Sequence, residues 1–178
     1  MQFDLVPHPT TPPAEPPFKV WASVDHVASL GPVATTNIWF GVSAPAERFV
    51  IPAVTEPWRA DELWRTTCFE AFFAAAGDEN YREWNFAARG NWAAYDFSGY
   101  RDSMQKAEVR SPPYIRMEDN FTWWTVGVTI AVDAEKQWDL GLSAVLEEKD
   151  GTKSYWALAH RSDEPDFHAR DCFAATLP

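Results

Sequence analysis

The sequence is short of the features that mark several common protein classes. It contains only two cysteines, Cys68 and Cys172, and no Cys-x-x-Cys or Cys/His spacing that would indicate a zinc site. No segment approaches the roughly 18 continuous apolar residues of a membrane-spanning helix, and no glycine-rich loop suggests phosphate binding. The cysteines leave one disulfide open, but two buried thiols are the favoured arrangement.

Positive charge is also scarce. Lysine and arginine total 15 against 26 acidic residues, for a net charge of −11. Nucleic acid and anionic membranes both require a basic face, so neither is expected as a partner. The first 17 residues have neither a basic start nor an apolar run, so we expect no signal peptide and a cytoplasmic location.

Aromatic residues are abundant. The 178 residues include 10 tryptophans, 12 phenylalanines and 5 tyrosines, more than one core usually absorbs, so some rings are expected at the surface. The length predicts a single domain, which we place at residues 18–178. Residues 1–17 are rich in proline, which fixes φ and lacks a backbone donor, and are predicted to be an extended arm along a sheet edge.

Short segments with alternating apolar and polar residues follow each other along the chain. The Asp150-Gly151 pair between two of them is a strong hairpin signal. No long amphipathic helix is evident, although residues 102–109 could hold a short one. The pattern predicts an all-β antiparallel sandwich or jelly roll. The predicted strands are residues 18–29, 35–43, 48–52, 67–75, 81–88, 91–97, 114–118, 121–132, 139–148, 154–159 and 172–177.

Residues 61–101 contain polar groups with no obvious structural role. Trp64 lies in a polar turn, and Glu70 in the following strand is on the same face as Phe72. Glu83 and Asn85 share one face of the next strand. These side chains are suited to binding a ligand, and they equally fit the solvated face of an antiparallel sheet.

These residues resemble the DOMON-like superfamily, which includes the family 9 carbohydrate-binding modules. The resemblance is one of order and spacing over residues 18–178, and it implies a β-sandwich. The matching positions are Trp64, Glu70, Tyr81, Trp84, Asn85, Trp156, Phe167 and Phe173.

The resemblance also implies a sugar site. Trp64 and Phe167 would clamp a sugar ring, and Glu70 would accept hydrogen bonds from its hydroxyls. The sequence departs from the family at Asn85, where the family has arginine, and at Val145, where it has an amide. The residues expected to bind a ligand are Trp64, Arg65, Glu70, Glu83, Asn85, Trp92, Phe167 and His168.

The favoured function is therefore non-catalytic binding of a saccharide or a sugar-containing metabolite. The first alternative is a protein–protein interaction or scaffold domain with an aromatic surface patch. The second is a haem-binding DOMON domain, although Met104 and Met117 do not match the axial-ligand pattern. We expect no cofactor, and place calcium or haem, a metal site between His160 and His168, and a glycosidase pair well below sugar binding.

Overall fold

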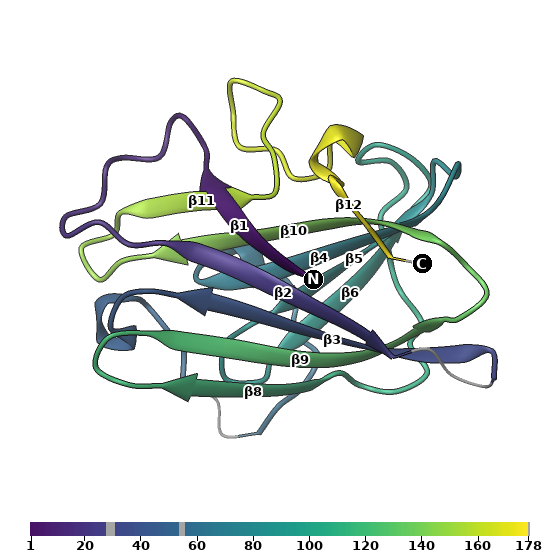
Figure 1. Cartoon of the computed structure of the whole chain (residues 1–178), viewed down its shortest axis with the longest axis horizontal. Helices are drawn as coiled ribbons and strands as arrows, with labels where there is room; N and C mark the ends of the chain where they lie inside the picture. Colours follow the sequence, from purple (N-terminus) through teal and green to yellow (C-terminus); the bar gives the residue numbers. More distant parts are fainter. Residues whose placement is uncertain (28–30, 54–55, 178) are drawn as a thin grey trace.

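The computed structural model describes residues 1–27, 31–53 and 56–177, and it confirms the all-β antiparallel sandwich. Two twisted sheets pack face to face (Figure 1). The strands are β1 (Gln2–Pro7), β2 (Val20–Val27), β3 (Val33–Val42), β4 (Cys68–Ala75), β5 (Tyr81–Phe86), β6 (Trp92–Phe97), β7 (Gln105–Lys106), β8 (Tyr114–Asp119), β9 (Trp124–Asp133), β10 (Trp138–Glu147), β11 (Lys153–Ala157) and β12 (Ala175–Leu177).

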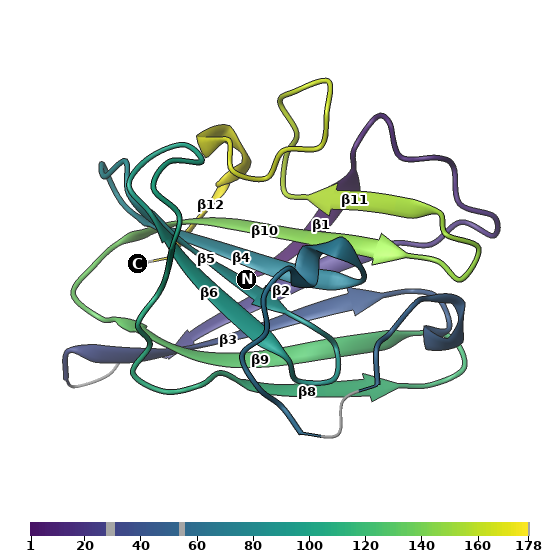
Figure 2. The ribbon, with the colours of Figure 1, turned by 180° about the vertical axis from the view of Figure 1, so that it is seen from behind.

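Sheet A has the order β1-β2-β3-β9-β8, and sheet B has the order β7-β6-β5-β4-β10-β11-β1, with β12 paired to one end of β10 (Figures 1 and 2). The first strand is shared between the sheets. Residues Gln2–Leu5 pair with β2, and Val6 and Pro7 pair with β11. A strand with a partner on only one side at each point suits a segment that runs into prolines, which cannot donate to a second neighbour.

The main core lies between the sheets, and alternation decides which side chains enter it. In β9, Trp124, Val126, Val128 and Ile130 face inward and are buried, as the sequence pattern predicts. In β4 the inward residues are Phe69, Ala71 and Phe73. The intervening residues of β4 point away from this core, which leaves them on the outer face of sheet B.

On the outer face of sheet A, two tryptophans lie across glycines of the neighbouring strand. Trp21 is paired with Gly41 and Trp39 with Gly127. A Cβ on Gly41 would lie 2.0 Å from the Trp21 indole, and one on Gly127 would lie 2.8 Å from that of Trp39. Arg116 covers Trp39 from β8, 4.5 Å from the ring centroid. These rings are packed on the sheet rather than held out for stacking.

Two sequence predictions were wrong. Residues 48–52 are not a strand: Ala46–Arg48 forms a 3₁₀ turn, and Phe49 makes only an isolated bridge to Glu148. Residues 102–109 hold no helix, because Ser103 has φ +52°, outside the helical region, and Gln105–Lys106 form the short β7. The closing segment also begins later than predicted, since Arg170–Cys172 is a 3₁₀ turn before β12.

The expected hairpin and the expected state of the cysteines are both present. The hairpin turn before β11 is present, with Gly151 at φ +90°, where glycine is favoured. Cys68 and Cys172 are both buried free thiols. Among the described residues, no helix has the length and apolar character needed to cross a membrane.

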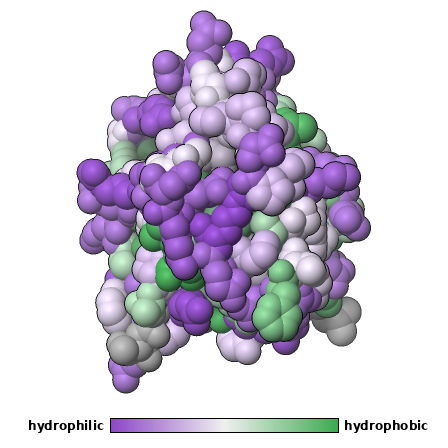
Figure 3. All heavy atoms as spheres, turned by 90° about the vertical axis from the view of Figure 1, so that its left-hand side faces the viewer, coloured by the Kyte–Doolittle hydropathy of each residue, from purple (hydrophilic) through white to green (hydrophobic). Residues whose placement is uncertain are grey.

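The end of the sandwich at the left of Figure 1 is mostly hydrophilic, with apolar side chains in small separate groups (Figure 3).

Candidate functional site

The outer face of sheet B brings together three of the predicted residues. Glu70 in β4 is the cross-strand partner of Asn85 in β5, and Glu83 is on the same face of β5. Ser143 of β10 lies opposite Glu70 on the other side. The antiparallel register therefore collects two carboxyl groups, an amide and a hydroxyl from three neighbouring strands.

This face is covered rather than solvated. The segment between β11 and β12 and the 3₁₀ turn Leu63–Arg65 pack over it, so Glu70 and Glu83 each keep only 4% of their surface exposed and Asn85 keeps none. The interpretation of these residues as a wet sheet face is wrong. The apolar residues of this second cluster are Phe72, Ala74, Tyr81, Ala93, Tyr95, Phe97, Val145, Ala157, Phe167, Cys172 and Phe173.

Hydrogen bonds link the buried polar groups. Ser143 Oγ donates to Glu70 Oε2 at 3.0 Å, and Asn85 Nδ2 donates to Glu83 Oε1 at 2.6 Å. The Cys68 thiol lies 3.7 Å from Asn85 Oδ1. Each carboxyl thus has one side-chain donor on one oxygen, which is a modest set of partners for groups so deeply buried.

His168 reaches the same cluster from the covering segment. Its Nε2 lies 3.7 Å from Glu83 Oε2, and its Nδ1 shares a 2.8 Å hydrogen bond with the Tyr81 hydroxyl. The ring meets Phe72 and Phe97 edge to face, at centroid distances of 5.3 and 5.1 Å. His168 is therefore an anchor that ties the covering segment to the outer face of sheet B.

Burial changes the acid–base properties of these groups. It raises the pKa of Glu70 to about 8, with the nearby Glu83 charge adding to the effect. Burial likewise raises the pKa of Glu83 to about 7, against the lowering effect of its hydrogen bond from Asn85. Burial lowers the pKa of His168 to about 4, helped by the positive charge of Arg101. Near neutral pH the cluster therefore holds a neutral imidazole and carboxyl groups that can keep a proton.

Trp64 and Phe167 both pack in the apolar cluster on the outer face of sheet B. Trp64, in the turn Leu63–Arg65, is half-buried and meets Tyr95 edge to face at 5.8 Å. Phe167 is buried and lies 6.5 Å from the Tyr155 ring. Arg65 follows Trp64 in the sequence but points into solvent, where it pairs with Glu62 at 2.8 Å. It therefore does not contribute to the cluster.

Trp92 does not belong to this cluster, and its prediction as a stacking ring needs correction. In β6 the Trp92 side chain points to the same side as Ala94, which is the inner face of sheet B. It is buried in the main core, where its ring is 6.0 Å from that of Trp84. The physical reason is simple alternation: Tyr95, three residues later, occupies the outer face instead.

The turn that carries Trp64 is tied to sheet B by residues that sequence reasoning missed. Tyr95 donates to Asp61 Oδ1 at 2.8 Å, and Lys106 pairs with Asp61 Oδ2 at 2.6 Å. These two hydrogen bonds lower the pKa of Asp61. Alternation in β6 could have placed Tyr95 on the Glu70 face, but only the folded chain shows that it holds the turn.

The histidine pair considered for metal binding has other partners. His160 Nε2 contacts the Val6 carbonyl at 2.9 Å, and its ring meets that of His8 edge to face. His168 is engaged with Tyr81 and Glu83 as described. Within residues 1–27, 31–53 and 56–177, no group of three or more His, Cys, Asp or Glu side chains is arranged to hold a metal ion.

Comparison with known proteins shows the fold. No protein-family model matches the sequence, and no curated protein matches it. The chain is similar in structure to a proposed carbohydrate-binding protein from Bacteroides uniformis ATCC 8492, with a TM-score of 0.62, 14% identity, and coverage of 99% of this chain and 85% of that one. It is also similar to a family 9 carbohydrate-binding module from Caldicellulosiruptor kristjanssonii in complex with cellotriose, with a TM-score of 0.54, 8% identity, and coverage of 89% and 72%. The chain thus has the β-sandwich fold of carbohydrate-binding modules.

Proposed function

We propose that this chain is a non-catalytic saccharide-binding domain of the DOMON-like type, and that it binds its ligand at the outer face of sheet B. The observation that carries the proposal is the buried group of Glu70, Glu83 and Asn85, which shares the outer face of sheet B with the apolar cluster that includes Phe167 and packs against Trp64. Fold-level similarity to carbohydrate-binding proteins, one of them in complex with cellotriose, supports the ligand class.

The chemistry of the cluster suits a sugar. A pyranose has an apolar C–H face that packs on an aromatic ring, and hydroxyls that both donate and accept hydrogen bonds. Because burial raises the pKa of Glu70 to about 8 and that of Glu83 to about 7, the cluster supplies a protonated carboxyl as donor and carboxylate and amide oxygens as acceptors. Asn85 supplies a neutral amide donor at the position where the resembled family has a charged arginine.

The proposed route to the cluster passes Trp64. The carboxyl groups are 4% exposed, whereas the Trp64 ring is half-buried at the border of the cluster. A sugar that enters on this side would displace the Trp64 side chain from its edge-to-face contact with Tyr95. Binding should therefore change the environment of this indole and its fluorescence.

Thermal shift and titration calorimetry with glucose and cellotriose test the proposal. A ligand at about a hundred times its Kd should stabilise the fold by roughly 2.7 kcal/mol and raise Tm by about 5 °C. The Glu70→Gln variant should lose most of this shift, because its amide replaces both the O–H donor of the protonated carboxyl and the charged acceptor of the carboxylate form. Glu118→Gln, which removes the same charge from the exposed strand β8, should keep it.

Trp64→Ala should reduce the fluorescence response to sugar, and Trp123→Ala, at an exposed ring in the turn before β9, should leave it intact. Loss of the response in both variants, or in neither, would remove Trp64 from the site. A flat thermal response to both sugars would contradict saccharide binding and favour the interaction-domain alternative, for which Phe121, 91% exposed, offers an unpacked ring.

A further inference from the structure

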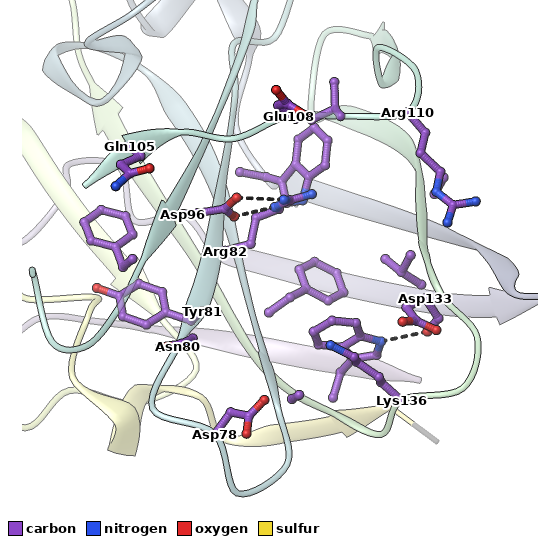
Figure 4. A pocket seen from close by; sticks show the side chains of 18 of the residues that line it. Asp78, Asn80, Tyr81, Arg82, Asp96, Gln105, Glu108, Arg110, Asp133 and Lys136 are labelled. Atoms are coloured by element: carbon purple, nitrogen blue, oxygen red, sulfur yellow. Dashed lines mark hydrogen bonds and ion pairs between the residues drawn. The ribbon is translucent and has the colours of Figure 1, made fainter. Parts of the chain in front are cut away.

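A second candidate site lies on the other side of sheet B. A cavity of about 610 Å³ opens at the end of the sandwich, between the inner faces of the two sheets and the segment that follows β6 (Figure 4). Its lining from sheet B includes Phe73, Trp84 and Asp96, which have the opposite parity to Glu70, Glu83 and Tyr95. The volume is within the roughly 300–1,000 Å³ typical of small-molecule sites.

The floor of the cavity is aromatic. Phe73 and Trp84 are buried beneath it, and Trp138 forms one wall with its ring 5.9 Å from Phe73, edge to face. Trp138 Nε1 donates to the Asp133 carbonyl at 3.1 Å, which fixes the orientation of the indole. The Lys136 ammonium lies 5.5 Å from the same ring (Figure 4). The floor therefore offers fixed apolar surface to the carbon face of a ligand.

The rim holds a planar ion pair. Arg82 Nε and Nη2 donate to the two oxygens of Asp96 at 2.7 and 2.8 Å, and the two side chains are 34% and 46% exposed. Arg82 Nη1 makes no hydrogen bond with any residue that the structure describes, and each Asp96 oxygen retains a free lone pair. Donors and acceptors thus lie side by side at the edge of an aromatic floor, an arrangement that suits hydroxyl groups, which need both.

The charges of the cavity favour an uncharged ligand. Three cations line it, Arg82, Arg110 and Lys136, and they are nearly balanced by acidic side chains. A chain with a net charge of −11 repels a free anion, and the near balance of charges in the lining leaves little net attraction for a free cation. The acidic residues of the lining are Asp78, Asp96, Glu108 and Asp133.

We propose that this cavity is a second saccharide site, in which the apolar face of the sugar packs on Trp138, above the buried Phe73, and vicinal hydroxyls bind the Arg82–Asp96 pair. This inference rests on the proposed saccharide function and assigns that ligand class a second position in the fold. The Arg82–Asp96 pair and the Glu70–Glu83 cluster project from opposite sides of sheet B, so a variant of Asp96 leaves Glu70 and Glu83 in place, although Tyr81 and Phe97 border both regions.

Glucose and cellotriose are the test ligands. Their binding is measured by titration calorimetry and by NMR spectra of protein that carries ¹⁵N-labelled tryptophan. The indole signal of Trp138, assigned with Trp138→Phe, should shift on addition of sugar. Asp96→Asn should weaken this binding at least about tenfold, the effect expected from losing one charged hydrogen-bond partner. Asp25→Asn, which changes the same charge at an exposed position of β2, should have no effect.

The outcomes separate the two proposals. Binding that Glu70→Gln abolishes and Asp96→Asn leaves unchanged overturns the cavity site and retains the outer-face site. Binding that shifts Trp138 and depends only on Asp96 retains the cavity and overturns the outer-face site. If neither sugar shifts any indole signal at tens of millimolar, both proposals are wrong. Since the Arg82–Asp96 pair is half exposed, its loss should cost no more than about 1 kcal/mol of stability, and the variant should remain folded.

Discussion

Glu70 and Glu83 are the residues whose chemistry depends most on the fold. Both are buried acids with raised pKa values, about 8 and about 7 against a usual 4.5. Between pH 4.5 and these values the folded chain binds more protons than the unfolded chain, so the free energy of unfolding falls as pH rises. His168 acts in the opposite direction at lower pH, because its pKa is lowered from 6.5 to about 4 and its contribution is lost as pH falls through that range.

The two effects separate above pH 6.5, where only the carboxyl groups still titrate. We expect the protein to lose on the order of 1–2 kcal/mol of stability between pH 6.5 and 8. Glu70→Gln, which cannot ionise, should lose less than half of that. Urea denaturation at a series of pH values measures both slopes, and Glu118→Gln is the control for removing an exposed charge. An unchanged slope in Glu70→Gln would show that Glu70 titrates as it does in the unfolded chain.

At the scale of elements, β1 is the strand that joins the two sheets. Leu5 enters the main core with 3% exposure, whereas the next residue, Val6, is 44% exposed. Figure 1 shows β1 running from beside β2 to beside β11, so one short strand completes an edge of each sheet. Its inward side chain should therefore matter much more to stability than its outward one.

Leu5→Ala is expected to reduce the free energy of unfolding by about 2–4 kcal/mol, through lost apolar burial and the cavity left behind. Val6→Ala, one residue away on the same strand, should cost less than about 1 kcal/mol. Chemical denaturation of the two variants side by side measures the difference. Equal losses would mean that β1 contributes through its backbone pairing alone.

At the scale of the whole molecule, sheet B is covered on both faces and sheet A on one. The main core lies on the inner side of β4 and the second apolar cluster on its outer side. β8, in contrast, is an edge strand with mostly exposed side chains. The backbone amides of a strand covered on both faces exchange hydrogen with solvent only when a large part of the structure opens.

Hydrogen exchange should reflect this layering. We expect amides of β4 and β10 to exchange slowest, and those of β7 and β8 about a hundredfold faster or more. Exchange measured by mass spectrometry or NMR on the intact chain gives the comparison directly. Protection of β8 equal to that of β4 would indicate that an edge of sheet A is covered in solution.

Alternation along the chain predicts the faces of the main strands, but it predicts neither β1 (Gln2–Pro7) nor β7 (Gln105–Lys106). Period-two alternation places Glu83 and Asn85 on one face of their strand and Glu70 on the face of Phe72 in its own, because successive side chains of a strand point to opposite sides. The strand register then brings the two faces together. The same rule, applied to β6, assigns Trp92 to the core and Tyr95 to the outer face. Local signals were weaker at residues 48–52 and 102–109, where backbone turns replaced the predicted elements.

Tertiary structure decided what those faces do. Whether a polar sheet face is wet or buried depends on the segment after β11, which returns to cover it through His168 and Phe167 from more than eighty residues further along the chain than Glu83. The pairing of Arg82 with Asp96 and the cavity beside Trp138 likewise depend on strand register and on the packing of two sheets. Such contacts join residues distant in sequence, and no local pattern encodes them.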